Sequence, residues 1–330
     1  MSFKVVDLFC GCGGLSLGFE RAGFDVVGAA DAWDAALAVH ARNLAHKIRS
    51  MDLSDVEATV GYLMKSNPDI VIGGPPCQDF SIAGNRDESA GRASLTLSFA
   101  NAVCRVRPRA FVMENVYVAL KTDTYAEAFA CFRDSGYGIT AMVLDASRCG
   151  CPQARRRCFT IGFLDGTDDE LAESLRSHLA EKQMTVRDYF GDSLGFEHYF
   201  VMPRSYARRG IFSVDEPAAT VRGMSRPMPA TYRRHPRDTC EPELAHVLTI
   251  AERGWFQTFP KWFEFFGSKS DVAQMIGNAV PVNMARYVAS ILMARLCELD
   301  GLDFDDARIS EVIGSTFTKD SVRDTVMMLH

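Results

Sequence analysis

The chain lacks the features that would place it in a membrane or outside the cell. No window approaches the roughly 18 consecutive apolar residues needed to cross a bilayer, and residues 1–7 lead into a strand-like segment rather than a signal peptide. An excess of positive charge is also missing, because 36 Lys and Arg stand against 42 Asp and Glu, a net charge of −6. We expect a cytoplasmic protein without membrane contact, which would meet any nucleic acid with a local basic surface.

A disulfide or metal framework is equally absent from the sequence. The ten cysteines are scattered over 330 residues, unlike the dense pattern of a small secreted domain. Cys10 and Cys12, and likewise Cys149 and Cys151, are separated by one residue rather than two, and no His pair accompanies them. We therefore expect no disulfide and no bound metal. Hydrophobic residues at 47% and charged residues at 24% are typical of a globular protein.

Short β-branched runs alternate with amphipathic segments of helical length from residue 4 to about residue 165. Strands are predicted at 4–8, 25–29, 69–72, 109–113, 139–144 and 158–163. Helices are predicted at 14–22, 33–43, 54–65, 95–105 and 123–134. This alternation is typical of an α/β fold with a doubly wound, mostly parallel sheet, whose site lies at the carboxyl ends of the strands.

The second half of the chain changes character. Residues 166–185 are acidic and helix-like and are interpreted as a connector. Between 201 and 240, eight arginines stand against three acidic residues, a local net charge of +5, and Gly and Pro replace regular periodicity. We predict a small, loop-rich, basic domain at 186–245. The first domain, 1–165, is then completed by 246–330, where Pro281 is expected in the first turn of a helix that packs back onto it.

Residues 7–14, Asp-Leu-Phe-Cys-Gly-Cys-Gly-Gly, run from a predicted strand through a glycine-rich turn into a helix. Such a turn lets a ligand approach backbone N–H groups at the helix start, although a tight structural turn explains it equally well. Asp31, at the end of the next strand, suits a ribose, and Asp52 follows the third segment. Each of these acids alone could equally be a helix cap.

Cys77 follows the apolar run 70–72 and lies in Gly73-Gly74-Pro75-Pro76-Cys77. A cysteine on a rigid turn beyond a buried strand is better placed as a nucleophile than as a core residue. Glu114 ends another predicted strand at the same edge, where a raised pKa and a general-acid role are plausible. Arg155 and Arg157 alternate in an extended segment and are expected to share one face.

These motifs together resemble the bacterial DNA cytosine-5 methyltransferases. The resemblance rests on DLFCGCGG, GGPPCQDFS, ENV, QARRR, Thr220-Val221 after a basic region, and QMIGNAVP at 274–281, in the order of that family. It implies S-adenosyl-L-methionine as cofactor, with Asp31 on the ribose, Asp52 on the adenine amine, and Asn278 and Val280 closing the pocket. The cofactor residues so implied are Phe9, Cys10, Gly11, Gly13, Gly14, Leu15, Asp31, Ala32, Asp52, Leu53, Pro75, Asn278 and Val280.

The resemblance also implies a mechanism. A cytosine is flipped out of duplex DNA, Cys77 adds to carbon 6, Glu114 bonds ring nitrogen 3, Arg155 contacts the cytosine carbonyl and Arg157 helps to hold the active-site loop. The implied DNA-binding residues are Gln78, Ser81, Arg92, Thr220, Val221, Arg222, Arg226, Arg233 and Arg234. Residues 84–95 suit a loop that closes over DNA. The partner is double-stranded DNA, the chain is expected to be a monomer, and a cognate restriction endonuclease acting separately stays an open option beside an orphan role.

Three other interpretations stay open at this point. An RNA branch of the same family, which modifies transfer RNA, carries a Cys-Phe-Thr stretch, and residues 158–160 read Cys-Phe-Thr here, although in a predicted core strand. A second alternative is a non-catalytic DNA-binding relative, which the complete set of Cys77, Glu114, Arg155 and Arg157 disfavours. A nicotinamide dehydrogenase would have no use for a Pro-Pro-Cys turn, and its glycine spacing differs.

Overall fold

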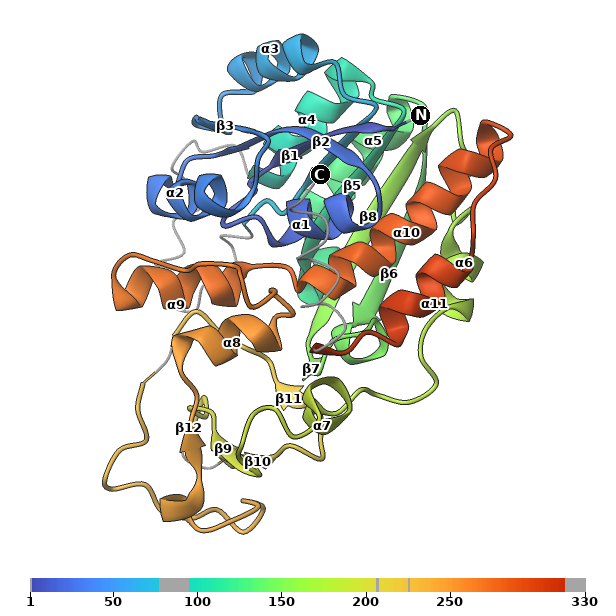
Figure 1. The fold of residues 1–330 in the computed structure, drawn as a ribbon. Coiled ribbons are helices and arrows are strands. Elements are labelled where there is room, and N and C mark those ends of the chain that lie inside the picture. Colours follow the sequence, from blue (N-terminus) through green and yellow to red (C-terminus); the bar gives the residue numbers. More distant parts are fainter. Residues whose placement is uncertain (1, 77–94, 206–207, 225, 318–330) are drawn as a thin grey trace.

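The computed structural model describes residues 2–76, 95–205, 208–224 and 226–317, and a seven-stranded sheet forms its centre (Figure 1). The strand order is β3-β2-β1-β4-β5-β8-β6. The strands are β1 (Lys4–Leu8), β2 (Asp25–Asp31), β3 (Lys47–Ser50), β4 (Ile70–Gly73), β5 (Ala110–Val116), β6 (Tyr137–Asp145) and β8 (Arg156–Leu164). The predicted α/β fold with a mostly parallel sheet is confirmed.

Side chains alternate between the two faces of this sheet, as the period of a strand requires. In β1, Val5 packs into one core cluster and Val6 into the other, and in β5 the same holds for Val112 and Phe111. Both faces are covered by helices, which explains why the central strands are apolar nearly throughout.

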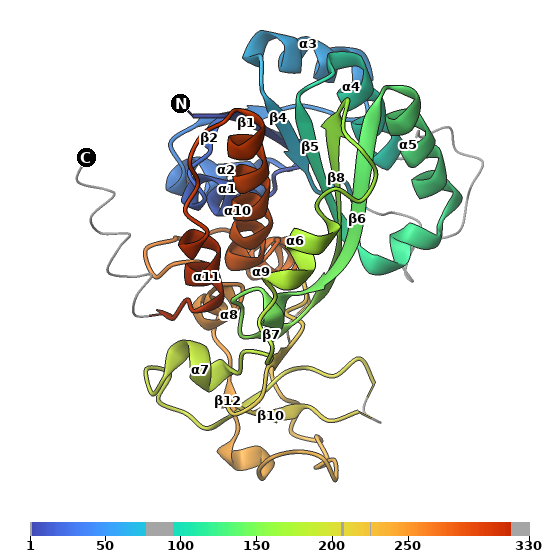
Figure 2. The same ribbon diagram turned by 90° about the vertical axis from the view of Figure 1, so that its right-hand side faces the viewer.

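Helices cover the two faces in separate layers (Figures 1 and 2). One face carries α3, α4 and α5, and the other carries α1, α6, α10 and α11. The helices are α1 (Gly14–Arg21), α2 (Asp34–Asn43), α3 (Val56–Ser66), α4 (Leu95–Val106), α5 (Asp123–Asp134), α6 (Ala172–Ser177), α7 (Val186–Phe190), α8 (Ile250–Phe256), α9 (Lys269–Asn278), α10 (Val282–Leu299) and α11 (Ala307–Ile313). Short 3-10 turns lie at η2 (Tyr117–Lys121), η3 (Ala146–Arg148) and η4 (Pro242–Leu244).

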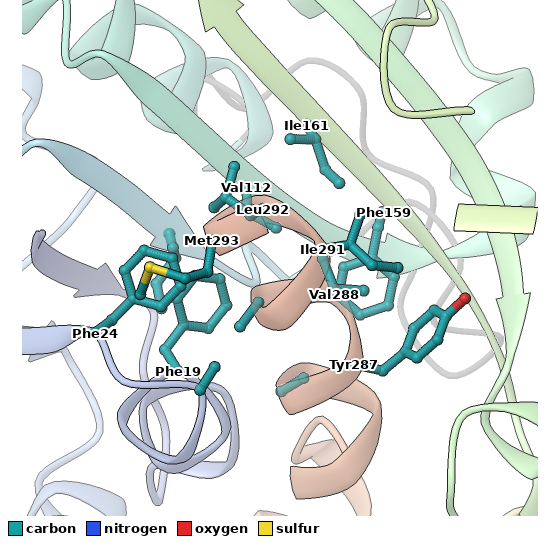
Figure 3. Close-up of a cluster of buried hydrophobic side chains, with 14 of the residues drawn as sticks. Phe19, Phe24, Val112, Phe159, Ile161, Tyr287, Val288, Ile291, Leu292 and Met293 are labelled. Atoms are coloured by element: carbon teal, nitrogen blue, oxygen red, sulfur yellow. The ribbon is translucent and has the colours of Figure 1, made fainter. Parts of the chain in front are cut away.

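Helix α10 lies at the centre of one layer (Figure 3). Its side chains Val288, Ile291 and Leu292 pack beside Phe159 of β8 and Phe19 of α1, all at most 1% exposed. Phe19 and Leu292, which are 273 positions apart in sequence, therefore belong to one core, in agreement with the expectation that the C-terminal helix packs back onto the first domain.

The exception to parallel pairing is β8, which runs antiparallel to both β5 and β6. Its connection from β6 passes only through η3 and the two-residue strand β7 (Gln153–Ala154). A connection this short joins antiparallel neighbours, whereas a parallel pair needs a crossover of a dozen residues or more.

A smaller unit lies below the carboxyl end of the large sheet in Figure 1. Its three-stranded sheet contains β9 (His198–Phe200), β10 (Ile211–Ser213) and β12 (His246–Val247), while β11 (Ala218–Ala219) pairs in parallel with β7. Since β12 pairs with β9, this sheet extends two residues past position 245. An aromatic cluster around Tyr199 and Phe256 joins it to α8.

Three local predictions were wrong or incomplete. Strand β3 was not predicted, because Ile48 is its single apolar residue and it lies at the edge of the sheet. The helix-like segment at 166–185 contains only the six-residue α6. Pro281 caps α10 with an extended ψ of 130° rather than occupying its first turn, since the helix begins at Val282.

Candidate active site

The glycine turn after β1 is held in an unusual backbone conformation. Phe9 has a φ of 59°, a left-handed value that is uncommon for a bulky residue, and Gly11 and Gly13 have φ of 51° and 97°. The carboxylate of Asp31, at the end of β2, accepts hydrogen bonds from Gly11 N at 2.8 Å and from Trp33 N at 2.9 Å. Asp31 therefore fixes the turn.

The turn meets the segment between α9 and α10. A Cβ at Gly14 would lie 2.4 Å from Val280 O, so only glycine permits this close approach. In contrast, a Cβ at Gly11 would meet nothing within 4 Å, which leaves open space beside the turn. The structure thus brings the glycine turn at 7–14 into contact with the segment at 274–281, close to the other end of the chain.

The other residues predicted to hold a cofactor lie along the same edge of the sheet. Asp52 follows β3 and is exposed, and hydrogen bonds from Ser54 lower the pKa of its carboxyl. Leu15 and Leu53 are buried, as are Cys10 and Pro75, whereas Ala32 and Asn278 are exposed. The ends of β1, β2, β3 and β4 and the turn before α10 supply the whole set.

The ends of β4 and β5 form a second group. Asn115 donates from Nδ2 to Pro75 O at 3.0 Å and so fixes the turn that leads toward position 77. A Cβ at Gly74 would lie 3.4 Å from Glu114 Oε2, which places this carboxyl directly beside the same turn. Asn115 was not predicted, although its place directly after the carboxyl predicted to be catalytic was a usable signal.

Glu114 is a buried carboxyl, 7% exposed, beside a guanidinium. Arg157 Nε lies 3.0 Å from Glu114 Oε1, but within the described residues this oxygen has no hydrogen-bond partner of good geometry. Burial raises the pKa of Glu114, against the opposite effects of Arg157 and Arg155. The carboxyl therefore combines a tendency to hold a proton with an unsatisfied oxygen.

Arg155, which was predicted to contact a cytosine carbonyl, is buried and occupied by backbone oxygens. Its guanidinium is 1% exposed and donates to the backbone oxygens of Val221 at 3.1 Å, Gly277 at 3.0 Å and Ala279 at 3.1 Å. Residue 155 lies between β7 and β8 rather than in one continuous strand, so its side chain turns into the junction between the two sheets. Arg157, at the start of β8, is the arginine beside Glu114.

Two glutamines complete this junction. Gln153 accepts from Val221 N at 2.8 Å and donates to Gln257 Oε1 at 2.8 Å. Gln257 in turn donates to Ile276 O at 2.6 Å. Both side chains are fully buried. Gln257 was missed because no motif surrounds it, and a buried glutamine cannot be distinguished from an exposed one in sequence.

Thr220 and Val221 support the smaller unit from within. Thr220 Oγ1 donates to Ala154 O at 2.9 Å, and Val221 is only 5% exposed. Arg222 is partly buried and donates to Met202 O, which orders the chain between β9 and β10. These residues therefore shape the basic unit instead of forming its outer surface.

The outer surface carries Arg226, Arg233 and Arg234, which are all exposed. Arg234 pairs with Glu241 at 2.6 Å. Their loop is organised by Asp238, whose carboxylate accepts from Gly210 N, Ile211 N, Tyr232 Oη and His235 N at 2.7–3.0 Å. Sequence reasoning counted Asp238 only as a charge, although an acid within a Gly- and Pro-rich basic stretch is a signal for a loop-organising side chain.

Several predicted residues lie outside the described ranges. Cys77, Gln78, Ser81 and Arg92 belong to this group, as does nearly all of the predicted closing loop at 84–95. In the part of the chain that the structure describes, no cluster of three His, Cys, Asp or Glu side chains could hold a metal ion. None of the helices in these ranges is both long and apolar enough to span a membrane.

The sheet, with a single antiparallel strand between β5 and β6 and a glycine turn after β1, defines the class of S-adenosyl-L-methionine-dependent methyltransferases. The Schizosaccharomyces pombe Dnmt2 methyltransferase matches with a TM-score of 0.69 over 90% of this chain and 99% of that chain, at 18% identity, and shows the fold. An Escherichia coli prophage protein described as a putative DNA modification methyltransferase matches with a TM-score of 0.63, at 25% identity over 89% of this chain and 99% of that chain.

The family model for C-5 cytosine-specific DNA methylases matches residues 3–294, and the chain belongs to this family. Type II methyltransferase M.HgiDI of Herpetosiphon aurantiacus is 50% identical over 89% of this chain and 95% of its own length. Type II methyltransferase M.HindV of Haemophilus influenzae is 51% identical over 88% and 96%. The protein is a DNA cytosine-5 methyltransferase, as its motifs predicted, and the RNA alternative is not favoured.

Proposed function

We propose that the chain methylates carbon 5 of a flipped-out cytosine in a short duplex DNA sequence through a covalent Cys77 adduct. The observation that carries this proposal is the buried Glu114 carboxyl, with its unsatisfied oxygen, beside the Gly74–Pro76 turn that leads into Cys77. A carboxyl that retains a proton can donate to ring nitrogen 3 of cytosine, which an ionised and fully solvated carboxylate cannot do.

In the proposed reaction, the Cys77 thiolate forms a bond to carbon 6, and the electron pair of the carbon 5–carbon 6 double bond becomes available at carbon 5. Glu114 neutralises the charge that develops at nitrogen 3 by donating its proton there. When bound, S-adenosyl-L-methionine supplies an electrophilic methyl group for carbon 5. Transfer of the carbon 5 proton to a water molecule then restores the carbon 5–carbon 6 double bond and expels the thiolate, and Glu114 recovers its proton from nitrogen 3.

We propose different roles for the two arginines. Arg157, whose Nε lies 3.0 Å from Glu114 Oε1, would contact the cytosine carbonyl and keep Glu114 oriented. Arg155 would be a positioning residue, because it ties the start of β8 to Val221 of the smaller unit and to the backbone oxygens of Gly277 and Ala279 at the end of α9. This assignment reverses the expectation from the motif for these two side chains.

The residues around the glycine turn fit a nucleoside cofactor. Open space faces Gly11, the first turn of α1 has no side-chain cap, and Asp31 and Asp52 lie at or after the carboxyl ends of the neighbouring parallel strands β2 and β3. Free N–H groups at a helix start and an acid at the end of the next strand suit a ribose with a charged tail. Phe9, Asn278 and Val280 would close this pocket.

The exposed arginines of the smaller unit would contact DNA. Arg226, Arg233 and Arg234 present positive charge on a unit joined directly to the active-site strand. Relatives named Type II methyltransferases favour a restriction-modification role, with a cognate endonuclease that acts separately. We place the enzyme in the bacterial cytosol, where its DNA substrate lies, and propose that it acts as a monomer.

The test is transfer of labelled methyl groups from S-adenosyl-L-methionine to unmethylated duplex DNA or to transfer RNA, followed by mapping of 5-methylcytosine. We expect label in duplex DNA at one short sequence. Cys77→Ala should abolish transfer while duplex binding, measured by gel shift, persists. Normal turnover in that variant would refute the covalent mechanism, and label in RNA alone would refute the choice of substrate.

A further inference from the structure

A chain of buried side chains links the glycine turn to the protein surface. His40 of α2 contacts Gly11 O through Nδ1 at 3.2 Å, and its Nε2 lies 2.7 Å from His46 Nε2. His46 Nδ1 lies 2.8 Å from Glu20 Oε1 on α1. His40 is fully buried, and the side chain of His46 is 3% exposed. No motif pointed to these residues.

The acceptors at the two ends of this hydrogen-bonded series, Gly11 O and the Glu20 carboxylate, determine how many protons the two rings must carry. A backbone oxygen and a carboxylate both accept hydrogen bonds, so His40 must donate to Gly11 O and His46 must donate to Glu20. The contact between the rings needs a third proton. Two neutral imidazoles carry only two N–H groups, and one ring must therefore be an imidazolium for all three contacts to form.

The additional proton belongs on His46. Burial and the neighbouring His46 lower the pKa of His40 to about 3, so His40 is the neutral ring, with its proton on Nδ1. His46 then donates from both nitrogens, with its charge balanced by Glu20. Of the other ionisable side chains around the pair, Cys12 donates to Met275 O and Lys47 is exposed.

Gly11 is held from both sides by this arrangement. Its N–H donates to Asp31 and its C=O accepts from His40, so two independent contacts fix the peptides on either side of the residue that faces the open space. A Cβ at Gly13 would lie 2.7 Å from Leu44 Cδ1 and 3.2 Å from His40, which shows that the turn packs directly on the His40 ring.

We propose that the His40–His46–Glu20 chain is the positioning device of the cofactor turn, and that one bound proton couples it to the affinity for S-adenosyl-L-methionine. The inference rests on the proposed cofactor site. Loss of the proton removes one of the three contacts. The backbone oxygen of Gly11 then loses its ring donor and keeps only the Cys10 Sγ contact at 3.8 Å, or the two rings lose their shared hydrogen bond, or His46 detaches from Glu20.

Glu20→Gln separates this role from simple packing. A glutamine amide can donate to Nδ1 of a neutral His46, so all three contacts persist without the additional proton. His40→Phe instead removes the contact to Gly11 while keeping a ring in the core. His178→Gln, at the C-terminal end of α6, is the matched histidine control. Asp31→Ala is the positive control for loss of affinity.

The measurements are calorimetric binding of S-adenosyl-L-methionine between about pH 6 and 9.5 and nitrogen-15 spectra of the histidine rings without ligand. We expect the wild-type Kd to rise with pH and the Glu20→Gln Kd to stay flat. For His40→Phe we expect Kd and KM to rise about tenfold, the loss of one hydrogen bond, with kcat little changed. The spectra should show His46 protonated on both nitrogens and His40 on Nδ1 alone.

The outcomes distinguish failure of the proposed positioning role from failure of the proposed cofactor site. A wild-type Kd that is independent of pH, or an unchanged Kd in His40→Phe, overturns the positioning role. If wild-type protein binds no S-adenosyl-L-methionine, the proposed cofactor site fails instead, and the ring spectra still decide whether the proton chain exists. Should His40→Phe not fold, Glu20→Gln and the spectra of the wild type carry the test.

Discussion

The large sheet and the smaller basic unit are stabilised in different ways. The large sheet has continuous apolar clusters on both faces, and the carboxyls of Asp31 and Glu114 lie at or near the carboxyl ends of its strands. The smaller unit has strands of only two or three residues, and its loops are fixed by single buried polar groups such as Asp238. The apolar side chains of the smaller unit gather around Tyr199 and Phe256, so individual hydrogen-bonding side chains determine the conformation of the loops outside this cluster.

The largest effect on activity is expected where a substitution removes the proton donor but keeps the fold. In Glu114→Gln the side chain keeps its shape but cannot transfer a proton to cytosine, so we expect kcat to fall by about 10²–10⁴. Thermal unfolding should change little, because the apolar core around β5 persists. The exposed Glu181→Gln is the control and should retain full activity. A variant at position 114 with normal turnover would show that the strand-end carboxyl does no chemistry.

A large loss of stability should follow from a change at the junction. Arg155→Met would leave the backbone oxygens of Val221, Gly277 and Ala279 without their donor, and we expect the free energy of unfolding to fall by about 3 kcal/mol. Urea denaturation measures this change. Arg226→Met, an exposed arginine on the same unit, should stay within about 0.5 kcal/mol of the wild type. Equal losses in the free energy of unfolding at both positions would show that the buried junction is no more sensitive to substitution than the exposed surface.

The apolar strands of the large sheet could be predicted from the sequence, whereas the roles of the buried polar side chains could not. Strands β1, β4 and β5 were predicted from their apolar runs, since a parallel sheet covered on both faces leaves a strong signal. The acids at the strand ends were found for the same reason. The roles of Arg155 and Arg157 could not be separated in sequence, because the break between β7 and β8 turns one guanidinium into the junction and leaves the other beside Glu114.

Tertiary partners explain what else was missed. His40 lies on an amphipathic helix, and nothing in its sequence neighbours shows that it contacts a backbone oxygen 29 positions away. Asp238 and Gln257 also act on segments distant in sequence. A buried polar residue is defined by groups that the fold brings to it, whereas a core strand is defined by its own composition.

Besides Glu114, the large sheet contains the buried carboxyl of Asp7, which shows how a polar group inside the apolar core affects stability. Asp7 is fully buried on β1 and accepts from Ser16 Oγ at 2.6 Å, and burial raises the pKa of its carboxyl to about 8. The folded state therefore keeps a proton that the unfolded state releases above its ordinary pKa of 3.8. The stability that this proton contributes is complete below that value and is lost as the pH rises through about 8.

Asp7→Asn removes this dependence. Because the wild type loses about 1.4 kcal/mol per pH unit within that window, we expect the variant to gain about 2 kcal/mol relative to the wild type over roughly 1.5 pH units around pH 6. Chemical denaturation at a series of pH values measures the difference. The exposed Asp25→Asn should show no such trend. A constant difference between Asp7→Asn and the wild type would mean that Asp7 is ionised in the folded protein.

The smallest effect should come from the exposed arginines of the basic unit. Arg233 forms no ion pair with any residue in the described ranges, so Arg233→Gln should leave the free energy of unfolding within about 0.5 kcal/mol of the wild type. A contact to a phosphate would release about one counterion. We therefore expect a loss of affinity of a few-fold for every duplex, and a slope of log K against log salt that is shallower by about 1.

A contact to a guanine edge would instead cost about 1–3 kcal/mol on the target sequence alone and would leave non-specific binding unchanged. Fluorescence anisotropy with target and non-target duplexes at several salt concentrations distinguishes the two contacts, and unchanged binding on both duplexes would remove Arg233 from the DNA interface.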